Sequence, residues 1–402
     1  MTYKKRKKLI VFFLIFALLP LSGMAKKKST KEKPAYVFTI VKELKRTPVK
    51  NQARSGTCWV FSAISFLESE LLRKGKEEID LSEMFVVRHT YPQKALSYVR
   101  LHGHANFGPG GQFHDVTDRI RRHGILPEEV YPGMNIDEKR HNHGEMSSVL
   151  RGVLDGVLKR RGRRLTPRWM DAFEAVLDVY LGKSPESFSY QGKTYTPRSF
   201  VSDYLQLDLD DYIEITSYTH YPFYEKCRLE LPDNWSFNSD YYNVPIDVLE
   251  KTTDDAVEKG YTVAWDADVS DKGFSPRGKE SLTTYDSPDY AIVPLEDWED
   301  QTKADRKKKF NKPVREKEIT QEIRQKSFEN FNTTDDHLMH IVGIAKDQTG
   351  TKFYLVKNSW GTDRHHKGYD YISRSYFRLH TINIMINKHA LPLELKTKLK
   401  ID

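Results

Sequence analysis

Long apolar runs are absent from nearly all of this 402-residue sequence. After position 25, no stretch reaches the about 18 consecutive apolar residues that indicate a membrane-spanning helix. The one long apolar run, Leu9 to Leu21, follows a basic stretch, Lys4 to Lys8, and precedes small residues that end at Ala25. We therefore predict a Sec signal peptide over residues 1–25, export to the periplasm or the extracellular space, and no stable membrane anchor after cleavage. An uncleaved anchor is the alternative.

Cysteine is also scarce, with Cys58 and Cys227 as the two examples. In an exported chain an even number of cysteines suggests a disulfide, so a bridge between them is one interpretation. The alternative is that one of them is a reactive thiol. Cys227 lies in a strand-like run, "FYEKCRLEL", without a basic or glycine-rich signature, and we expect it to be a free structural thiol.

Histidine clusters with the spacing of metal ligands are missing. The candidates lack recognised ligand spacing with a carboxylate partner, so we expect loop histidines and neither a metal nor another cofactor. They are His102, His104, His114, His365 and His366.

A large excess of positive charge is missing too. The formal net charge is +8, but residues 1–25 supply five Lys or Arg and no acid, which leaves +3 for the remainder. Much of the other basic charge lies in two runs, 26–33 and 305–317, of the kind that usually forms solvated surface. We expect no nucleic-acid partner.

The chain is long, and its 12% aromatic content is ample for a large core. Residues 36–49 are expected to be extended. Apolar residues then recur at spacings of three and four from Trp59 to Leu72, which predicts a helix that begins at Cys58 and ends before Gly75. A second helix is expected within 108–132.

Further along, residues 145–215 carry mainly amphipathic helix signals. The last third instead contains β-branched and aromatic runs bounded by turn residues, and these predict strands at 260–269, 337–347, 351–360 and 369–377. A helical first half followed by a β-rich part indicates an α+β fold.

The candidate chemistry centres on Cys58. A thiolate is stabilised by a helix N-terminus and by an adjacent imidazolium, and the position of Cys58 supplies the first of these. His337 and His340 can each supply the second. They lie three residues apart in one predicted strand, so their side chains should point to opposite faces. Asn358 follows on the next strand, where its side chain can orient a histidine ring.

These residues resemble the active site of papain-like cysteine peptidases. The segment "NQARSGTCWVFS" is similar to the pattern C-G-[SA]-C-[WY] of that family, with Cys58 as the nucleophile. Gln52, six positions before Cys58, would donate to the oxyanion. The family's histidine stands six residues before a glycine, which selects His337 because Gly343 follows it at that distance.

The resemblance assigns further residues. "NSWG" matches the family's Asn-Ser-Trp-Gly, so Asn358 would complete the triad and Trp360 would shield the bond between asparagine and histidine. Gly110 and Gly111 are similar to the glycines that let the backbone of a substrate pair with the enzyme. Separately from the resemblance, Asp335 and Asp336 precede His337; adjacent residues on a strand point to opposite sides, so at most one flanks the site, and Asp336 is considered as a carboxylate that modulates it.

Two departures indicate a particular branch. Ser55 stands where the pattern has its first cysteine, and His337 lies 279 positions after Cys58 rather than the about 130–150 of papain itself. A mainly helical insertion at about 133–235 accounts for the longer spacing. Several segments resemble bleomycin hydrolase and bacterial aminopeptidase C, including "YLGKSPESFSYQGKTYTPRSF", "DYYNVPIDVL" and "GYTVAWDADVSD".

The resemblance implies a two-layer peptidase domain over 26–390, a tail over 391–402, peptide substrates, aminopeptidase activity and a possible homo-hexamer. In that branch a C-terminal arm restricts cleavage to the amino end of the substrate, and the ending "NKHALPLELKTKLKID" differs from it. Three alternatives therefore stand beside the aminopeptidase: an endopeptidase, a catalytically silent peptide-binding protein and an acyl transferase. "NSWG" argues against the last.

Overall fold

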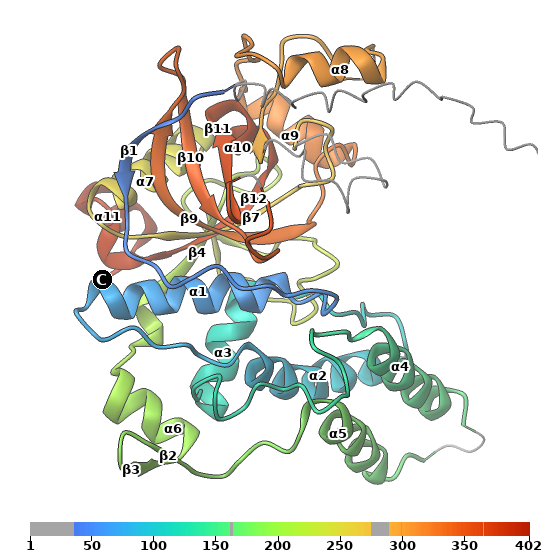
Figure 1. Ribbon diagram of the computed structural model, residues 1–402. Helices are drawn as coiled ribbons and strands as arrows, with labels where there is room; N and C mark the ends of the chain where they lie inside the picture. Colours follow the sequence, from blue (N-terminus) through green and yellow to red (C-terminus); the bar gives the residue numbers. More distant parts are fainter. Residues whose placement is uncertain (1–35, 161–163, 275–288, 299, 365) are drawn as a thin grey trace, which may run out of the picture. The chain divides into compact units, whose positions relative to one another are not determined.

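The computed structural model consists of a helical layer and a layer built on one large sheet, as the α+β prediction requires (Figure 1). It describes residues 36–160, 164–274, 289–298, 300–364 and 366–402. The described residues belong to one compact unit. The predicted signal peptide, 1–25, lies outside the described residues.

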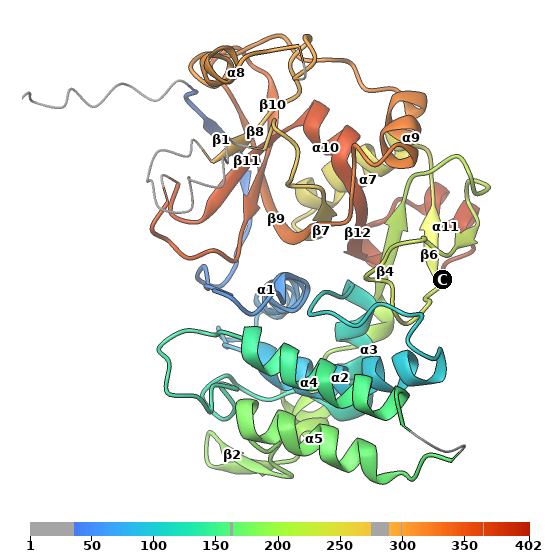
Figure 2. The same ribbon diagram turned by 90° about the vertical axis from the view of Figure 1, so that its right-hand side faces the viewer.

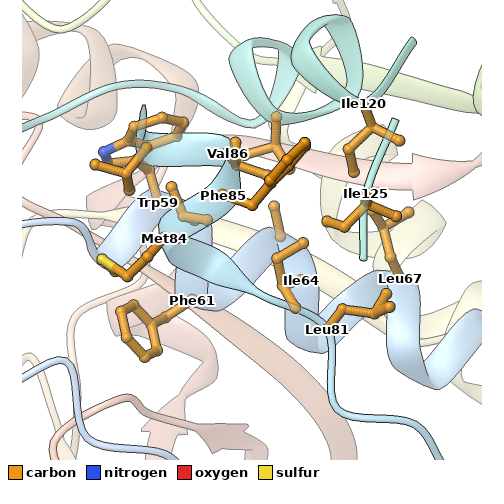
Figure 3. Close-up of a cluster of buried hydrophobic side chains, with 14 of the residues drawn as sticks. Trp59, Phe61, Ile64, Leu67, Leu81, Met84, Phe85, Val86, Ile120 and Ile125 are labelled. Atoms are coloured by element: carbon orange, nitrogen blue, oxygen red, sulfur yellow. The ribbon is translucent and has the colours of Figure 1, made fainter. Parts of the chain in front are cut away.

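The helical layer is formed by the N-terminal half of the chain. It contains α1 (Cys58–Arg73), α2 (Glu83–Arg100), α3 (Phe113–His123), α4 (Gly144–Leu158), α5 (Arg168–Leu181), α6 (Pro197–Ser199) and the helical turns η1 (Phe200–Leu205) and η2 (Leu209–Asp211), with the hairpin β2 (Phe188–Tyr190) and β3 (Lys193–Tyr195). Figure 3 shows the apolar core that joins α1, α2 and α3. Burial of these side chains fixes α1 between the other helices and the sheet.

Ten strands of the described part form the sheet. They are β1 (Thr39–Glu43), β4 (Tyr212–Thr216), β5 (Lys226–Cys227), β6 (Tyr241–Asn243), β7 (Val263–Ala267), β8 (Tyr290–Ala291), β9 (His337–Lys346), β10 (Lys352–Lys357), β11 (Tyr369–Ser373) and β12 (Thr381–Asn387). The order is β5-β6-β4-β12-β7-β9-β10-β11-β8, with β1 paired to β9.

The sheet separates two apolar cores. Along β9, Leu338 belongs to the core shared with α1, whereas Met339 and Ile341 belong to the core on the other face. The second core is covered by helices that follow the insertion (Figure 2): α7 (Ile246–Glu258), α10 (Arg374–His380) and α11 (Leu393–Leu399). Two further helices, α8 (Lys303–Lys309) and α9 (Gln321–Glu329), precede β9. Because successive side chains of β9 enter cores on opposite faces of the sheet, β9 is apolar at nearly every position.

The structure corrects two of the predicted elements. The strand predicted over 369–377 ends at Ser373, because the Ser373 hydroxyl accepts a hydrogen bond from the Tyr376 N–H at 3.1 Å and caps α10. The helical signals over 145–215 extend too far: residues 212–216 form β4, which pairs with β12. Pairing with a distant strand outweighs the local periodicity there.

Candidate active site

Cys58 is the first residue of α1 and is buried, with 9% of its surface exposed. The preceding Thr57 makes no side-chain cap, and its carbonyl accepts the Val60 N–H at 3.1 Å. The Cys58 N–H donates to none of the residues that the structure describes and keeps its donor capacity. The loop before Cys58 is fastened to the segment around Gly110. Trp59 Nε1 donates to the Pro109 carbonyl at 2.9 Å, and Gly56 adopts φ +67° against the Pro109 ring.

His337 and Asn358 form the polar pair that the sequence predicts. His337 begins β9, Asn358 follows β10, and the His337 Nε2 atom lies 2.9 Å from Asn358 Oδ1. Trp360 stacks on the His337 ring, with centroids 4.4 Å apart and planes inclined by 20°. The indole therefore covers the histidine and limits the access of water to the pair.

Asp370, in β11, holds the amide of Asn358 in one orientation. Asn358 Nδ2 donates to Asp370 Oδ2 at 2.7 Å, which directs Oδ1 toward His337. Oδ1 also accepts a hydrogen bond from the Ser359 N–H at 2.7 Å. Asp370 was not predicted as a site residue, although a signal for it existed, since this acidic residue interrupts an otherwise aromatic and β-branched strand.

Hydrogen bonds to Ser359 hold Gln52 next to the pair formed by His337 and Asn358. Its N–H donates to the Ser359 carbonyl at 2.8 Å, and its Oε1 accepts from the Ser359 hydroxyl at 2.6 Å. A turn bond from the Ser55 N–H to the Gln52 carbonyl, at 3.1 Å, leads the chain on to Cys58. Nε2 donates to none of the residues that the structure describes, so it keeps its donor capacity for another molecule.

The structure thus brings Cys58, Gln52, His337 and Asn358 to one place. Besides the contacts above, the Cys58 thiol forms a hydrogen bond with the backbone of Leu338, the residue after His337. Gly111 lies against Trp59, the residue after Cys58, because a Cβ on Gly111 would lie 3.0 Å from the Trp59 ring.

The electrostatic surroundings of Cys58 differ from those predicted. Burial raises the pKa of the Cys58 thiol to about 12, the hydrogen bond with Leu338 opposes this rise, and the carboxylates of Asp266, Asp233 and Asp335 add to it. Burial and negative charge therefore outweigh the stabilisation expected from the helix N-terminus. A base must remove the proton when the thiol reacts.

The other predicted residues lie away from this place. His340 Nδ1 is 2.9 Å from the Ser65 hydroxyl, and burial lowers the pKa of His340 well below its ordinary value. Its role as a strand histidine with a partner is confirmed. Cys58 and Cys227 are both free, so a bridge between them is absent.

One histidine expectation is wrong. His114 is not a loop residue but lies in α3, where its Nδ1 is 2.8 Å from Glu214 Oε2. His102 and His104 do follow α2 in a turn, and His366 lies in another. His365 lies outside the described residues.

Asp336 accepts hydrogen bonds from the Val269 and Ser270 N–H groups, at 3.3 and 3.0 Å.

No group of three or more His, Cys, Asp or Glu residues in the described part of the chain is arranged to hold a metal ion. Likewise, none of the helices found in the described ranges has the length and apolar character needed to cross a membrane.

Comparisons with known proteins agree with the geometry. A family model described as the Peptidase C1-like family matches residues 99–402, and one described as the papain family of cysteine proteases matches residues 38–149. The chain is 23% identical to aminopeptidase G of Lactobacillus delbrueckii subsp. lactis, with 87% of this chain and 83% of the relative aligned.

Two further relatives extend the comparison. Bleomycin hydrolase of Rattus norvegicus is 23% identical over 92% of this chain and 86% of its own, and aminopeptidase C of Lactococcus lactis subsp. cremoris is 22% identical over 88% and 83%. The crystal structure of PepW from Lactobacillus rhamnosis HN001 superposes with a TM-score of 0.65 at 20% identity, covering 90% of this chain and 84% of that one.

Proposed function

The chain belongs to the Peptidase C1-like family, in the branch of bleomycin hydrolase and aminopeptidase C, and from this premise we propose that Cys58 is the nucleophile of a cysteine peptidase with aminopeptidase activity. His337 acts as its base, Asn358 orients that base, and Gln52 donates to the oxyanion. The observation that carries the proposal is the 2.9 Å contact between His337 Nε2 and Asn358 Oδ1, beside a thiol at a helix N-terminus.

The chemistry follows from these positions. The pKa of the buried thiol is high, so the proton of Cys58 passes to His337 as the thiolate attacks the peptide carbonyl. The Cys58 N–H and Gln52 Nε2 hold the oxyanion, a contribution of about 3 kcal/mol per donor. His337 then returns the proton to the leaving amine. A water molecule, deprotonated by His337, releases the acyl group and restores the thiol.

The first test compares the two free thiols of the chain. We expect Cys58→Ala to abolish peptide hydrolysis and Cys227→Ala to retain it, because Cys227 is buried in β5 away from the site. Iodoacetamide should add one carboxamidomethyl group to the wild type on Cys58, as read by mass spectrometry of its peptides. Hydrolysis that survives Cys58→Ala would exclude this nucleophile.

The second test asks which bond is cleaved. Peptides with a free amino end and the same peptides with an acetylated end are digested, and the products are identified by mass. Release of the first residue from free peptides alone supports an aminopeptidase. Internal cleavage of both sets supports the endopeptidase alternative, and tight retention without products supports a silent peptide-binding protein.

We also propose that the enzyme acts after export. The support is the sequence of residues 1–25, in which a basic stretch precedes an apolar run that is too short for a spanning helix. Its substrates would then be peptides outside the cytoplasm.

A further inference from the structure

Three carboxylates from separate parts of the chain surround the nucleophile, and the mechanism above uses none of them. Asp233 follows β5, Asp266 lies in β7, and Asp335 stands two positions before His337. In the described part of the chain, none of the three forms an ion pair with a Lys, Arg or His side chain. The charge of Lys94 nevertheless acts on Asp233 and lowers the pKa of its carboxyl against the effect of burial.

Asp233 lies directly against Gly110. A Cβ atom on Gly110 would be 1.8 Å from Asp233 Oδ2 and 2.7 Å from Oδ1, so only glycine fits beneath this carboxylate. Asn106 Nδ2 holds Oδ1 at 2.8 Å. Oδ2 accepts no hydrogen bond from the residues that the structure describes.

The position of Gly110 relative to Cys58 is fixed. The preceding carbonyl, of Pro109, accepts the Trp59 indole N–H at 2.9 Å, and Trp59 is the residue after Cys58. Lys94 Nζ donates to the carbonyls of Gly108 (2.7 Å) and Gly110, which holds the segment from behind. Asp233 is thus held at a constant distance from the nucleophile.

Asp266 and Asp335 are linked to each other through the side chains of Gln112 and Asn383. Gln112 Nε2 donates to Asp335 Oδ2 at 3.0 Å, and Asn383 Nδ2 donates both to Gln112 Oε1 and to Asp266 Oδ2, each at 2.9 Å. Asp266 is fully buried and forms a side-chain hydrogen bond with Asp335, and burial raises the pKa of both carboxyl groups, so the pair holds a proton.

We propose that Asp233 receives the α-ammonium group of the peptide substrate and closes the site behind the first residue of that peptide. The inference deepens the proposed function and rests on it. An ammonium group supplies three donors and one positive charge, which match the free Oδ2 and the negative charge of Asp233. A substrate with a blocked amino end carries no such charge, and the Asp233 carboxylate excludes its blocking group sterically.

The titration of these groups agrees with this geometry. Burial raises the pKa of Asp233, and burial together with the charge of Asp233 raises that of Asp335 to about 8. The same carboxylates raise the pKa of the Cys58 thiol. A bound ammonium group opposes both effects, so the correct substrate would also ease the loss of the thiol proton.

The test uses binding and hydrolysis in the full chain. In a Cys58→Ala background, calorimetry measures binding of an alanine tripeptide amide and of its N-acetyl form. Asp233→Asn keeps the shape of the side chain and removes its charge. The matched control is Asp240→Asn in the same segment, an exposed aspartate that pairs with Lys226 at 2.9 Å.

We expect Asp233→Asn to weaken binding of the free-amino peptide by about twentyfold, the loss of a charge-assisted hydrogen bond, and to leave the acetylated peptide unchanged. Asp240→Asn should change neither. In the chain with Cys58 intact, Asp233→Ala should open the site, and hydrolysis of the acetylated peptide should rise relative to the free one.

Equal losses for both peptides in Asp233→Asn, or no loss for either, would overturn the assignment. Thermal unfolding of each variant identifies a general folding defect, and in that case the peptide preference of Asp233→Ala decides. Different results would contradict the proposed peptidase and the role of Asp233. A wild type that binds peptides without cleaving them contradicts the proposed peptidase, whereas cleavage with an unaltered amino-end preference in Asp233→Asn contradicts this inference alone.

Discussion

At the scale of single residues, the site depends on a chain of orientation. His337 is held by Asn358, whose amide is held by Asp370, and Arg364 Nη2 approaches Asp370 Oδ1 at 3.4 Å. An amide can point either way unless its surroundings distinguish oxygen from nitrogen. The ionised Asp370 carboxylate can only accept hydrogen bonds. It therefore binds the Nδ2 end of the Asn358 amide, and Oδ1 faces His337.

Asp370 is accordingly expected to be a positioning residue. In Asp370→Asn the new amide can donate as well as accept, so the Asn358 amide can turn and the His337 ring loses its fixed orientation. We expect kcat to fall by about a hundredfold with KM nearly unchanged. Asp363→Asn, at an exposed aspartate of the preceding loop, is the control.

Steady-state kinetics across a pH series would check this. A shifted pH profile of kcat with little change in unfolding temperature supports the positioning role. A large loss of stability with an unshifted profile would instead show that Asp370 serves the fold of β11.

At the scale of elements, α3 and β4 are joined by a buried ion pair. His114 in α3 lies 2.8 Å from Glu214 in β4, and Ser236 and Tyr241 also contact the His114 ring. Burial opposes the charge on His114, but the carboxylates of Glu214 and Asp115 outweigh it and raise the pKa of His114 from 6.5 to about 9. The pair links the helical layer to the sheet.

The stability of the protein should therefore depend on pH through His114. Because the folded pKa is raised, the contribution is fully present below pH 6.5 and is lost as the pH rises through about 9. We expect His114→Gln to cost about 2 kcal/mol at pH 6, below the about 3 kcal/mol that the shift itself implies, because the side chain keeps 16% exposure.

Urea unfolding of the wild type and of His114→Gln at pH 6 to 9.5 would measure this difference. The gap between the two should close toward the alkaline end, while His104→Gln, at an exposed turn histidine, should follow the wild type throughout. A gap that is constant with pH would mean that packing, not charge, carries the effect.

At the scale of the whole molecule, the segment predicted to be an insertion, residues 133–235, supplies far more than length. Its helices α4 and α5 pack against α2, its strand β4 enters the main sheet, and its end carries Asp233 to the site. A mainly helical insertion was predicted, but local periodicity could not show that part of it joins the sheet. The branch relationship is shown by the comparisons, whereas the number of subunits stays a prediction for light scattering.

Export is the remaining prediction at this scale. Expression in a host with a Sec pathway should yield a protein outside the cytoplasm whose intact mass corresponds to a chain that begins near Lys26, because signal peptidase cleaves after small residues such as Ala25. Replacing Leu14 with Arg would break the apolar run and should retain the full-length chain in the cytoplasm. A full-length chain in the membrane fraction would support the uncleaved anchor.

The sequence by itself determined the family, the α+β class, and the choice of Gln52, Cys58, His337 and Asn358 as the candidate catalytic residues. Those assignments rest on local motifs and on the periodicity of α1, which nearby residues encode. Only the tertiary structure decided which carboxylates meet the site: Asp370, Asp233 and Asp266 come from segments that are far apart in the chain. Their proximity depends on strand pairing and on the packing of the insertion, and neither leaves a pattern in the local sequence.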